Sequence, residues 1–500
     1  MAVFTWLTKT AAVNALAARL NNSSLWTAAE LWIMLTEGLR HFNALTEQWN
    51  QTFSVNNANG AWINTATLTG SPRLRSVTDQ YLYNQMAYML MESPLGGGAW
   101  VGTSQFNLGQ LQQALQVRTQ EVIQAASCNI AQLSPISATP GVRAGYALGD
   151  TVLEPRRNRF LALMAQTTAT ASSGASSLTV ASAVGIVKGQ VISGASLQAG
   201  MFATSVSGTA VGISLPTTGA LSGTAIQAFQ PFLLTREDVL SFQSFNPNYL
   251  QEVGYPMSWA VASEPPLSFD VDIAPTTPGN FDMLALDSGP TFAPPAATLL
   301  GVPDDWSMLP MYGALADVLG QEAECTDRAR SAYCLQRYTM MLEMMKGSNW
   351  LLQSRLNGAT ATTEALADMD CLAVNWQQSQ NNLPMVVEAG MDFIAPIPGV
   401  SQLLTLQLVG NAPLLDGTNT YVQVSRDDWD AVLNYAHHVS SFKLGNDEFQ
   451  ATVPMLKAFY QYCAQRNSRW AQYGVFVRAL RGEGEKQERS EPKWSTKEMQ

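Results

Sequence analysis

Charged residues are scarce in this chain. Only 13% of its 500 residues are Asp, Glu, Lys or Arg, which is about half the share found in an ordinary soluble domain. The net charge is −11, and the sequence has no long basic run of the kind that grips phosphates. A surface with few charges is common where neighbouring subunits cover much of it. Any DNA that passes close to this protein is therefore expected to be weakly bound or repelled.

Residues that carry chemistry are also few. The only histidines are His41, His437 and His438, and adjacent histidines on a helix point in different directions, which disfavours a shared metal. The five cysteines have no CxxC spacing, which predicts free thiols in a reducing cytoplasm. Walker, GxGxxG, GxSxG, HExxH and EF-hand patterns are all missing. We therefore predict a protein that is not an enzyme and that needs no metal or cofactor.

Long apolar runs are missing as well. No window approaches the ~18 consecutive apolar residues of a membrane span. Residues 1–20 lack the dense apolar centre of a signal peptide. We therefore expect neither a membrane segment nor a standard export signal. The hydrophobic content of 46% is still enough for several cores, which predicts three or four domains or modules.

Helices are expected to dominate the first part of the chain. Thr27 and Glu30 form a candidate capping box, and apolar residues follow at helical spacing. A second helix is predicted to begin near Thr78, and a third to cover about residues 107–126. Residues 51–68 have the pattern of a short hairpin with its turn at Asn57-Ala58-Asn59-Gly60.

The composition changes abruptly between residues 166 and 228, where Lys188 is the only charged residue. Gly, Ala, Ser, Thr and Val build this segment, and short β-branched runs alternate with glycine turns. A flexible linker would also have such low complexity, but the spacing of the branched residues favours a small all-β domain. The flanks 156–164 and 229–240 read as parts of one host domain, so we interpret the segment as an insertion.

An approximate internal repeat follows. Asp304-Asp305-Trp306 recurs 123 residues later as Asp427-Asp428-Trp429, and Ala274-Pro275 recurs 121 residues later as Ala395-Pro396. Each copy is predicted to form a β-hairpin or small sheet followed by two packed helices. The Asp pairs fall where a helix starts, so we interpret them as caps that favour the helix dipole rather than as catalytic carboxylates.

An aromatic pair keeps its spacing in both copies of the repeat. Tyr312 lies six residues after Trp306, and Tyr435 lies six residues after Trp429. On a helix these side chains would face the same core, so we assign all four residues to the structural core.

The last residues, 481–500, are rich in charge and contain glycine and proline, which predicts a disordered tail in the free subunit. Trp494 is unexpected there. It is either an incidental tail residue or an anchor for a partner, since Trp is favoured at binding hot spots. On the second interpretation, Lys493, Trp494 and Lys497 are the candidate partner-binding residues.

These patterns together predict an α+β protein. Its five expected segments are an N-terminal helical bundle leading into β-strands (1–165), an inserted Gly/Ser/Thr-rich all-β domain (166–228), a continuation of the host domain with the first β-plus-helix module (229–350), a second β-plus-helix module (351–480) and a charged flexible tail (481–500).

Three stretches carry a wider resemblance. They are Ala28-Ala29-Glu30-Leu31-Trp32 with Leu39-Arg40-His41-Phe42-Asn43-Ala44-Leu45, Gly254-Tyr255-Pro256 with Trp259-Ala260-Val261, and Val302-Pro303-Asp304-Asp305-Trp306 with Ala314-Leu315-Ala316-Asp317. Over most of residues 20–350 the chain resembles the head-to-tail adaptor (connector), or tail-tubular, family of tailed bacteriophages. The insert and the second repeat copy depart from the small members of that family.

The resemblance implies a virion structural protein of the phage neck or tail, assembled in the bacterial host cytoplasm. Its copies would form an oligomeric ring, expected to be a dodecamer, between the portal protein and the tail or nozzle proteins. Double-stranded DNA would pass through the channel without sequence-specific binding during DNA ejection. The helical part would make the ring contacts, the insert would face outward and the C-terminal tail would reach the portal.

Two other functions stay open. One is a hexameric tail nozzle or tube protein, in which the duplication would let six copies present twelve similar modules. The other is a virion-associated cell-wall hydrolase, which requires a catalytic constellation that the sequence does not display.

Overall fold

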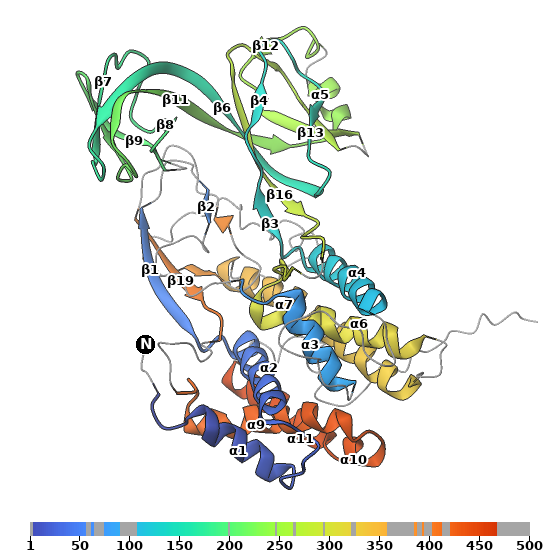
Figure 1. Cartoon of the computed structure of the whole chain (residues 1–500). Coiled ribbons are helices and arrows are strands. Elements are labelled where there is room, and N and C mark those ends of the chain that lie inside the picture. The colour runs from blue at the N-terminus through green and yellow to red at the C-terminus, as the bar shows by residue number, and fades with distance from the viewer. Residues whose placement is uncertain are drawn as a thin grey trace, which may run out of the picture.

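The protein is α+β, with helices at one end and a large mixed sheet at the other (Figure 1). This computed structural model describes residues 4–56, 62–64, 75–90, 108–198, 201–245, 248–263, 267–293, 296–321, 327–357, 385–387, 393–394, 403–412 and 421–467. The predicted tail and the repeated Ala395-Pro396 pair lie outside the described residues.

The helices of the described part are α1 (Lys9–Arg19), α2 (Ala28–Thr46), α3 (Asp79–Met89), α4 (Leu108–Ala126), α5 (Val239–Phe245), α6 (Met308–Gly320), α7 (Arg328–Asn357), α9 (Arg426–Ser440), α10 (Asn446–Gln450) and α11 (Val453–Arg466), with 3-10 turns η2 (Asp304–Trp306) and η4 (Ser441–Lys443). Among these described helices, none is both long and apolar enough to cross a membrane.

The strands are β1 (Asn50–Asn56), β2 (Ile63–Asn64), β3 (Ile130–Gln132), β4 (Ile136–Ala138), β5 (Tyr146–Ala147), β6 (Val152–Ala171), β7 (Ser177–Val180), β8 (Val191–Gly194), β9 (Ala203–Ser207), β10 (Ala210–Ile213), β11 (Leu221–Arg236), β12 (Val253–Gly254), β13 (Ser258–Ser263), β14 (Ser268–Val271), β15 (Ala274–Pro275), β16 (Gly279–Asp287), β17 (Met385–Val387), β18 (Phe393–Ile394) and β19 (Leu403–Val409).

Local signals set the starts of the long N-terminal helices. The Thr27 hydroxyl accepts the Glu30 N–H at 3.2 Å, and the Thr27 N–H donates to Glu30 Oε2 at 2.6 Å, which confirms the capping box at the start of α2. Thr78 caps α3 by accepting the Tyr81 N–H. The helix expected over about 107–126 is α4. These three helices agree with the predictions, because helix caps and the spacing of apolar residues are local properties of the sequence.

The hairpin predicted over residues 51–68 is wrong. Strand β1 pairs antiparallel with β19 from Asn50↔Val409 to Asn56↔Leu403, and β2 pairs with β18. The two strands thus bind partners from the last third of the chain instead of each other. Turn residues and the alternation of apolar and polar residues indicate that a strand forms, but they do not indicate which strand it pairs with.

Two long strands form the axis of the large sheet. Strands β6 and β11 pair antiparallel from Asn158↔Leu234 to Ala171↔Leu221. At one end they pair with β16, which flanks β6, and with β13, which runs parallel to β11. At the other end they extend into the group of strands β7–β10, which shares a hydrophobic cluster made only of residues between 165 and 228. The inserted strands therefore have a core of their own.

The helical end surrounds α2. Helix α2 packs against α1, α3, α9, α11 and the turn η2, while α6 packs against α4 and α7. One large hydrophobic cluster joins residues from both ends of the sequence. Each copy of the repeat contributes a turn or helix that touches α2, so α2 is the common element on which the site described next is built.

Candidate functional site

Asp304 ties two distant segments to the start of α6. It lies in η2 and is 4% exposed. Its carboxylate accepts the backbone N–H groups of Ser76 and Val77 at 2.8 and 3.0 Å, and the Ser76 hydroxyl at 2.5 Å. The Asn411 side chain donates to the same carboxylate at 3.3 Å. Asp304 therefore holds the residues before α3 and those after β19 together.

Asp305 makes a second tie, to α2. Asn43 of α2 donates to its carboxylate at 2.5 Å, and the Ala412 N–H donates at 3.1 Å. Asn43 also donates to the Gly410 carbonyl at 2.7 Å. Burial raises the pKa of Asp305 to about 7, although the hydrogen bonds from Ala412 and Asn43 act to lower it.

The prediction that this Asp pair caps a helix is wrong for the first copy. Both carboxylates of Asp304 and Asp305 receive their hydrogen bonds from segments far away in sequence instead of from the first turn of α6. The prediction used only the position of the pair at a helix start. Both side chains are buried beside backbone N–H groups of other segments, and these N–H groups need an acceptor when they are shielded from water.

In the second copy of the repeat, Asp428 occupies the position that Asp305 has in the first copy. Here Ser425 caps α9 by accepting the Asp428 N–H at 3.1 Å, and its hydroxyl donates back to Asp428 Oδ2 at 2.6 Å. Tyr462 and Arg466 donate to Oδ1 at 2.8 and 2.7 Å, and Gln48 donates to Oδ2 at 3.2 Å. Burial acts to raise the pKa of Asp428, but the bonds from Ser425, Tyr462 and Arg466 outweigh it and lower that pKa. The second copy is thus tied to the segment just beyond α2.

The repeated tyrosines meet at one carboxylate oxygen. The hydroxyls of Tyr312, from α6, and Tyr435, from α9, both donate to Oε1 of Glu37 at 2.8 Å. Gln85 of α3 donates to Oε2 of the same side chain. Burial raises the pKa of Glu37, while the positive charge of Arg337 and these hydrogen bonds act to lower it. The two copies of the repeat therefore converge on the middle of α2.

Arg337 of α7 extends this cluster. Its Nη2 donates to the Tyr435 hydroxyl at 2.5 Å, and its Nη1 donates to the Tyr460 hydroxyl at 2.7 Å. The Tyr460 hydroxyl lies 3.2 Å from Nε2 of His41. Burial, reinforced by the charge of Arg337, lowers the pKa of His41 well below its usual value, so the imidazole is neutral and shares a hydrogen bond with the Tyr460 hydroxyl. We call Glu37, Arg337 and the three tyrosines the Glu37 cluster.

The repeated tryptophans have different neighbours. Trp306 is fully buried and meets the ring of His41 edge-on at 6.0 Å. Trp429 is 9% exposed and meets the ring of Trp6 edge-on at 6.3 Å. Trp306 lies in a 3-10 turn and Trp429 in the first turn of an α-helix. The structure thus brings the two tyrosines together but places each tryptophan in its own pocket of the core.

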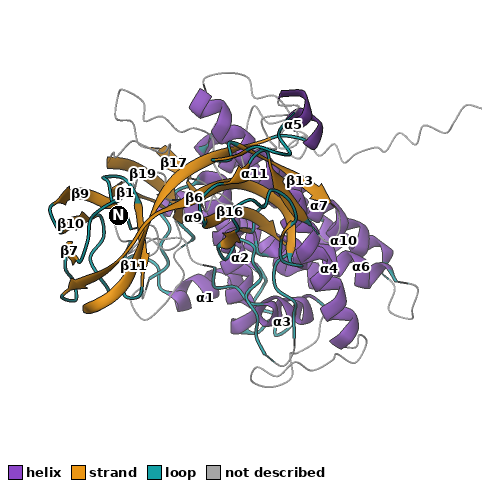
Figure 2. Ribbon diagram, turned by 90° about the horizontal axis from the view of Figure 1, so that it is seen from above, coloured by secondary structure: helices purple, strands orange, loops and turns teal. Residues whose placement is uncertain are grey.

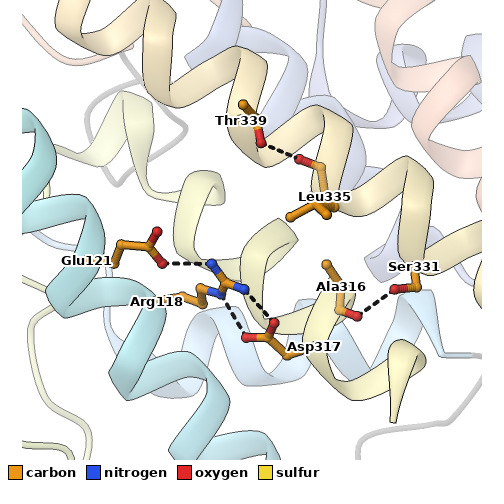
Figure 3. Close-up of polar contacts among 7 residues, drawn as sticks. All are labelled: Arg118, Glu121, Ala316, Asp317, Ser331, Leu335 and Thr339. Carbon is orange, nitrogen blue, oxygen red and sulfur yellow. Dashed lines mark hydrogen bonds and ion pairs between the residues drawn. The ribbon is translucent and has the colours of Figure 1, made fainter. Parts of the chain in front are cut away.

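A second group of polar contacts joins α4, α6 and α7 (Figure 3). Arg118 of α4 grips both carboxylate oxygens of Asp317 on α6, at 2.7 and 2.5 Å, and donates to Glu121 at 2.7 Å. Ser331 of α7 donates to the Ala316 carbonyl at 2.7 Å. A planar guanidinium that binds one carboxylate with two bonds fixes orientation as well as distance.

Metal-ligating and thiol side chains are the remaining chemical groups of the described part. Within the described residues, no group of three or more His, Cys, Asp and Glu side chains could hold a metal ion. The side chains of Cys128, Cys334 and Cys463 are buried, and burial raises the pKa values of Cys334 and Cys463. Buried thiols with raised pKa values are poor nucleophiles.

The candidate residues Lys493, Trp494 and Lys497 lie outside the described residues. Glu37 and Arg337, which contact the repeated tyrosines, were not predicted from the sequence. One signal was available for Glu37: together with His41 and Asn43 it places polar groups within a helix that is otherwise largely apolar. Compared by sequence with models of known protein families and with curated proteins, the chain matches none of them.

Proposed function

We propose that this chain is a non-enzymatic virion structural protein that forms a ring at the head-to-tail interface of a tailed phage. The observation that carries a structural role is the use of the repeated Asp residues. Asp304, Asp305 and Asp428 each accept hydrogen bonds from segments distant in sequence. Carboxylates committed in this way tie a framework together, whereas a hydrolase needs carboxylates that face a substrate.

The proposed position of this protein in the virion comes from its resemblance to the head-to-tail adaptors of tailed phages. The ring would extend the DNA channel under the portal protein and join the capsid to the tail or nozzle proteins. In the finer architecture we propose, the N-terminal helical bundle carries the β insert, and two β-plus-helix modules follow. The tail 481–500, with Lys493, Trp494 and Lys497, docks on the portal.

A hexameric tail nozzle or tube is the second candidate, and the paired tyrosines favour it. Tyr312 and Tyr435 reach the same oxygen of Glu37 from α6 and α9. Two similar modules arranged about one helix would let six copies present twelve similar surfaces to a twelvefold partner.

Attachment to the portal tests the proposal. The full chain, a variant ending at residue 480 and Trp494→Ala are each mixed with purified portal protein of the same phage at physiological salt. We expect the full chain to be retained and both variants to be retained poorly, because the anchor is lost. If the full chain is not retained, a position under the portal is wrong. If both variants are retained like the full chain, the tail is not the docking element.

A further inference from the structure

One end of the large sheet carries a group of exposed apolar side chains. Leu240 of α5 is 72% exposed and Met257 is 58% exposed, and Leu250 and Val253 are also exposed. They belong to one region, because the Thr235 N–H, shortly before α5, donates to the Met257 carbonyl at 2.9 Å, and Leu250 and Val253 lie between α5 and Met257 in sequence. The ring of Tyr249, next to Leu250, lies 6.2 Å from that of Phe242 in α5. We call these four residues the α5 surface.

Acidic residues border the α5 surface. Asp238 and Glu252 are exposed, and Glu237 is half-buried. All three lie within the same stretch of chain as the four apolar residues. The surface therefore combines an apolar centre with a negative rim, the arrangement of a protein interface.

The inserted strands carry a smaller surface of opposite charge. Val184 is 86% exposed, and Val187 and Met164 are exposed beside it. Gly185 has a φ of +83°, and a Cβ there would lie 2.8 Å from the Met164 carbonyl, so this turn lies directly on β6. Lys188 is exposed and is the only charge between residues 166 and 228. We call Met164, Val184, Val187 and Lys188 the insert tip.

These two surfaces lie at different points along the long β6–β11 ribbon, which Figures 1 and 2 show: Met164 lies within β6, whereas α5 follows the end of β11. One chain cannot bring them into contact, because the paired strands hold them apart. A second copy can. A contact between two different patches of identical subunits is head-to-tail, and it closes into a ring when the rotation between copies fits.

We propose that the insert tip of one copy docks on the α5 surface of the next copy around the ring. This inference rests on the proposed ring, and it departs from the expectation that the insert faces outward. Valine and methionine side chains bury against Leu240 and Met257, while Lys188 faces the acidic rim.

Charge favours this pairing over the other occupants. Two α5 surfaces facing each other would bring the carboxylates of Glu237, Asp238 and Glu252 against their own copies, which is repulsive. The same acidic rim would be repelled by anionic lipid headgroups. The insert tip offers both apolar side chains and a positive charge.

Cysteine cross-linking in the full chain tests the contact. Chains carrying Val187→Cys and chains carrying Leu240→Cys are co-expressed, purified as assemblies and treated with a short bis-maleimide. We expect cross-linked pairs in the co-expressed sample and only background, as in the unsubstituted chain, when either variant is expressed alone. Val117→Cys on α4, an equally exposed valine position outside both surfaces, replaces Val187→Cys in the matched control.

Lys188→Glu supplies a second measurement. It leaves the apolar contact in place but opposes the acidic rim, so we expect the apparent affinity between subunits to fall roughly three- to tenfold at low salt, with a smaller loss at high salt. Lys188→Gln should lie between the two, because it removes the charge without reversing it.

The outcomes separate the contact from the ring. Rings without cross-links in the co-expressed sample would overturn the contact and leave the ring standing. Cross-links when one variant is expressed alone would show a symmetric contact and overturn the head-to-tail arrangement, and equal cross-linking in the Val117→Cys control would reduce it to random collision. A chain that stays monomeric at every concentration and forms no cross-links would contradict both proposals.

Discussion

At the scale of single residues, Glu37 is where the two halves of the repeat meet. Tyr312 and Tyr435 could be singled out from the sequence, because their spacing after Trp306 and Trp429 is the same. Their shared partner could not, because Glu37 lies some 270 and 400 residues away and nothing local marks it as their acceptor. For the same reason the partners of Asp304 and Asp305 were assigned to a helix start instead of to distant backbone.

We predict that the two tyrosine hydroxyls are energetically coupled. Tyr312→Phe should lower the free energy of unfolding by about 1–3 kcal/mol, since a buried carboxylate oxygen loses one donor. Tyr435→Phe should cost more, because Arg337 also loses its acceptor. The double variant should exceed the sum by at least about 0.5 kcal/mol, as Oε1 then loses both donors.

Denaturant unfolding of the four proteins of this cycle measures the coupling. Tyr255→Phe, at an exposed tyrosine, is the control and should change stability by less than about 0.5 kcal/mol. Additive costs would show that Tyr312 and Tyr435 do not share an acceptor.

The raised pKa of Asp305 predicts a pH dependence. Below about pH 3 this carboxyl is largely protonated in both the folded and the unfolded chain. As the pH rises toward 7, the unfolded chain ionises first, so the folded state loses stability relative to a chain without this group, by at most about 4 kcal/mol. Asp305→Asn does not titrate and serves as the reference.

Unfolding of wild type and Asp305→Asn is compared between pH 4 and pH 8. We expect the stability of the wild type relative to the variant to fall as the pH rises, whatever constant cost the amide has. A constant difference across this range would mean that the carboxyl has an ordinary pKa.

At the scale of elements, the helices could be predicted and the strand pairing could not. Helix α2 begins at the predicted capping box because the signals for a helix start lie within four residues. Strands β1 and β19 lie about 350 residues apart in sequence, and their pairing depends on the packing of the whole helical end. The change of composition over residues 166–228 is also a local signal, and strands β7–β10 of this segment share one hydrophobic cluster.

The contact between α4 and α6 gives a prediction at this scale. A Cβ on Gly313 would lie 2.9 Å from two carbons of the Arg118 side chain and 3.0 Å from the Tyr338 ring. Gly313→Ala should therefore push Arg118 away from Asp317 and cost about 1–3 kcal/mol. Thermal unfolding measures this loss.

Gly149→Ala is the matched control, since a Cβ there would meet no atom within 4 Å and should change stability little. If Gly313→Ala were as neutral as Gly149→Ala, the Arg118 side chain would not pack directly against Gly313 of α6, and this contact would be contradicted.

At the scale of the whole molecule, a helical end carries a long β ribbon (Figure 1). The Glu37 cluster and the contacts of Arg118 with Asp317 and Glu121 hold the helices together, and the ribbon separates the α5 surface from the insert tip. We propose that the apolar surface outside this framework contacts neighbouring copies, which agrees with a charged fraction of only 13%.

Electron microscopy of the purified full-length protein tests the central claim most directly. Class averages count the subunits and show whether they enclose a channel. We expect closed rings around an open axis, with twelve subunits for an adaptor or six for a nozzle. A population of single subunits or of open filaments, at every protein concentration and also in the presence of portal protein, would contradict it.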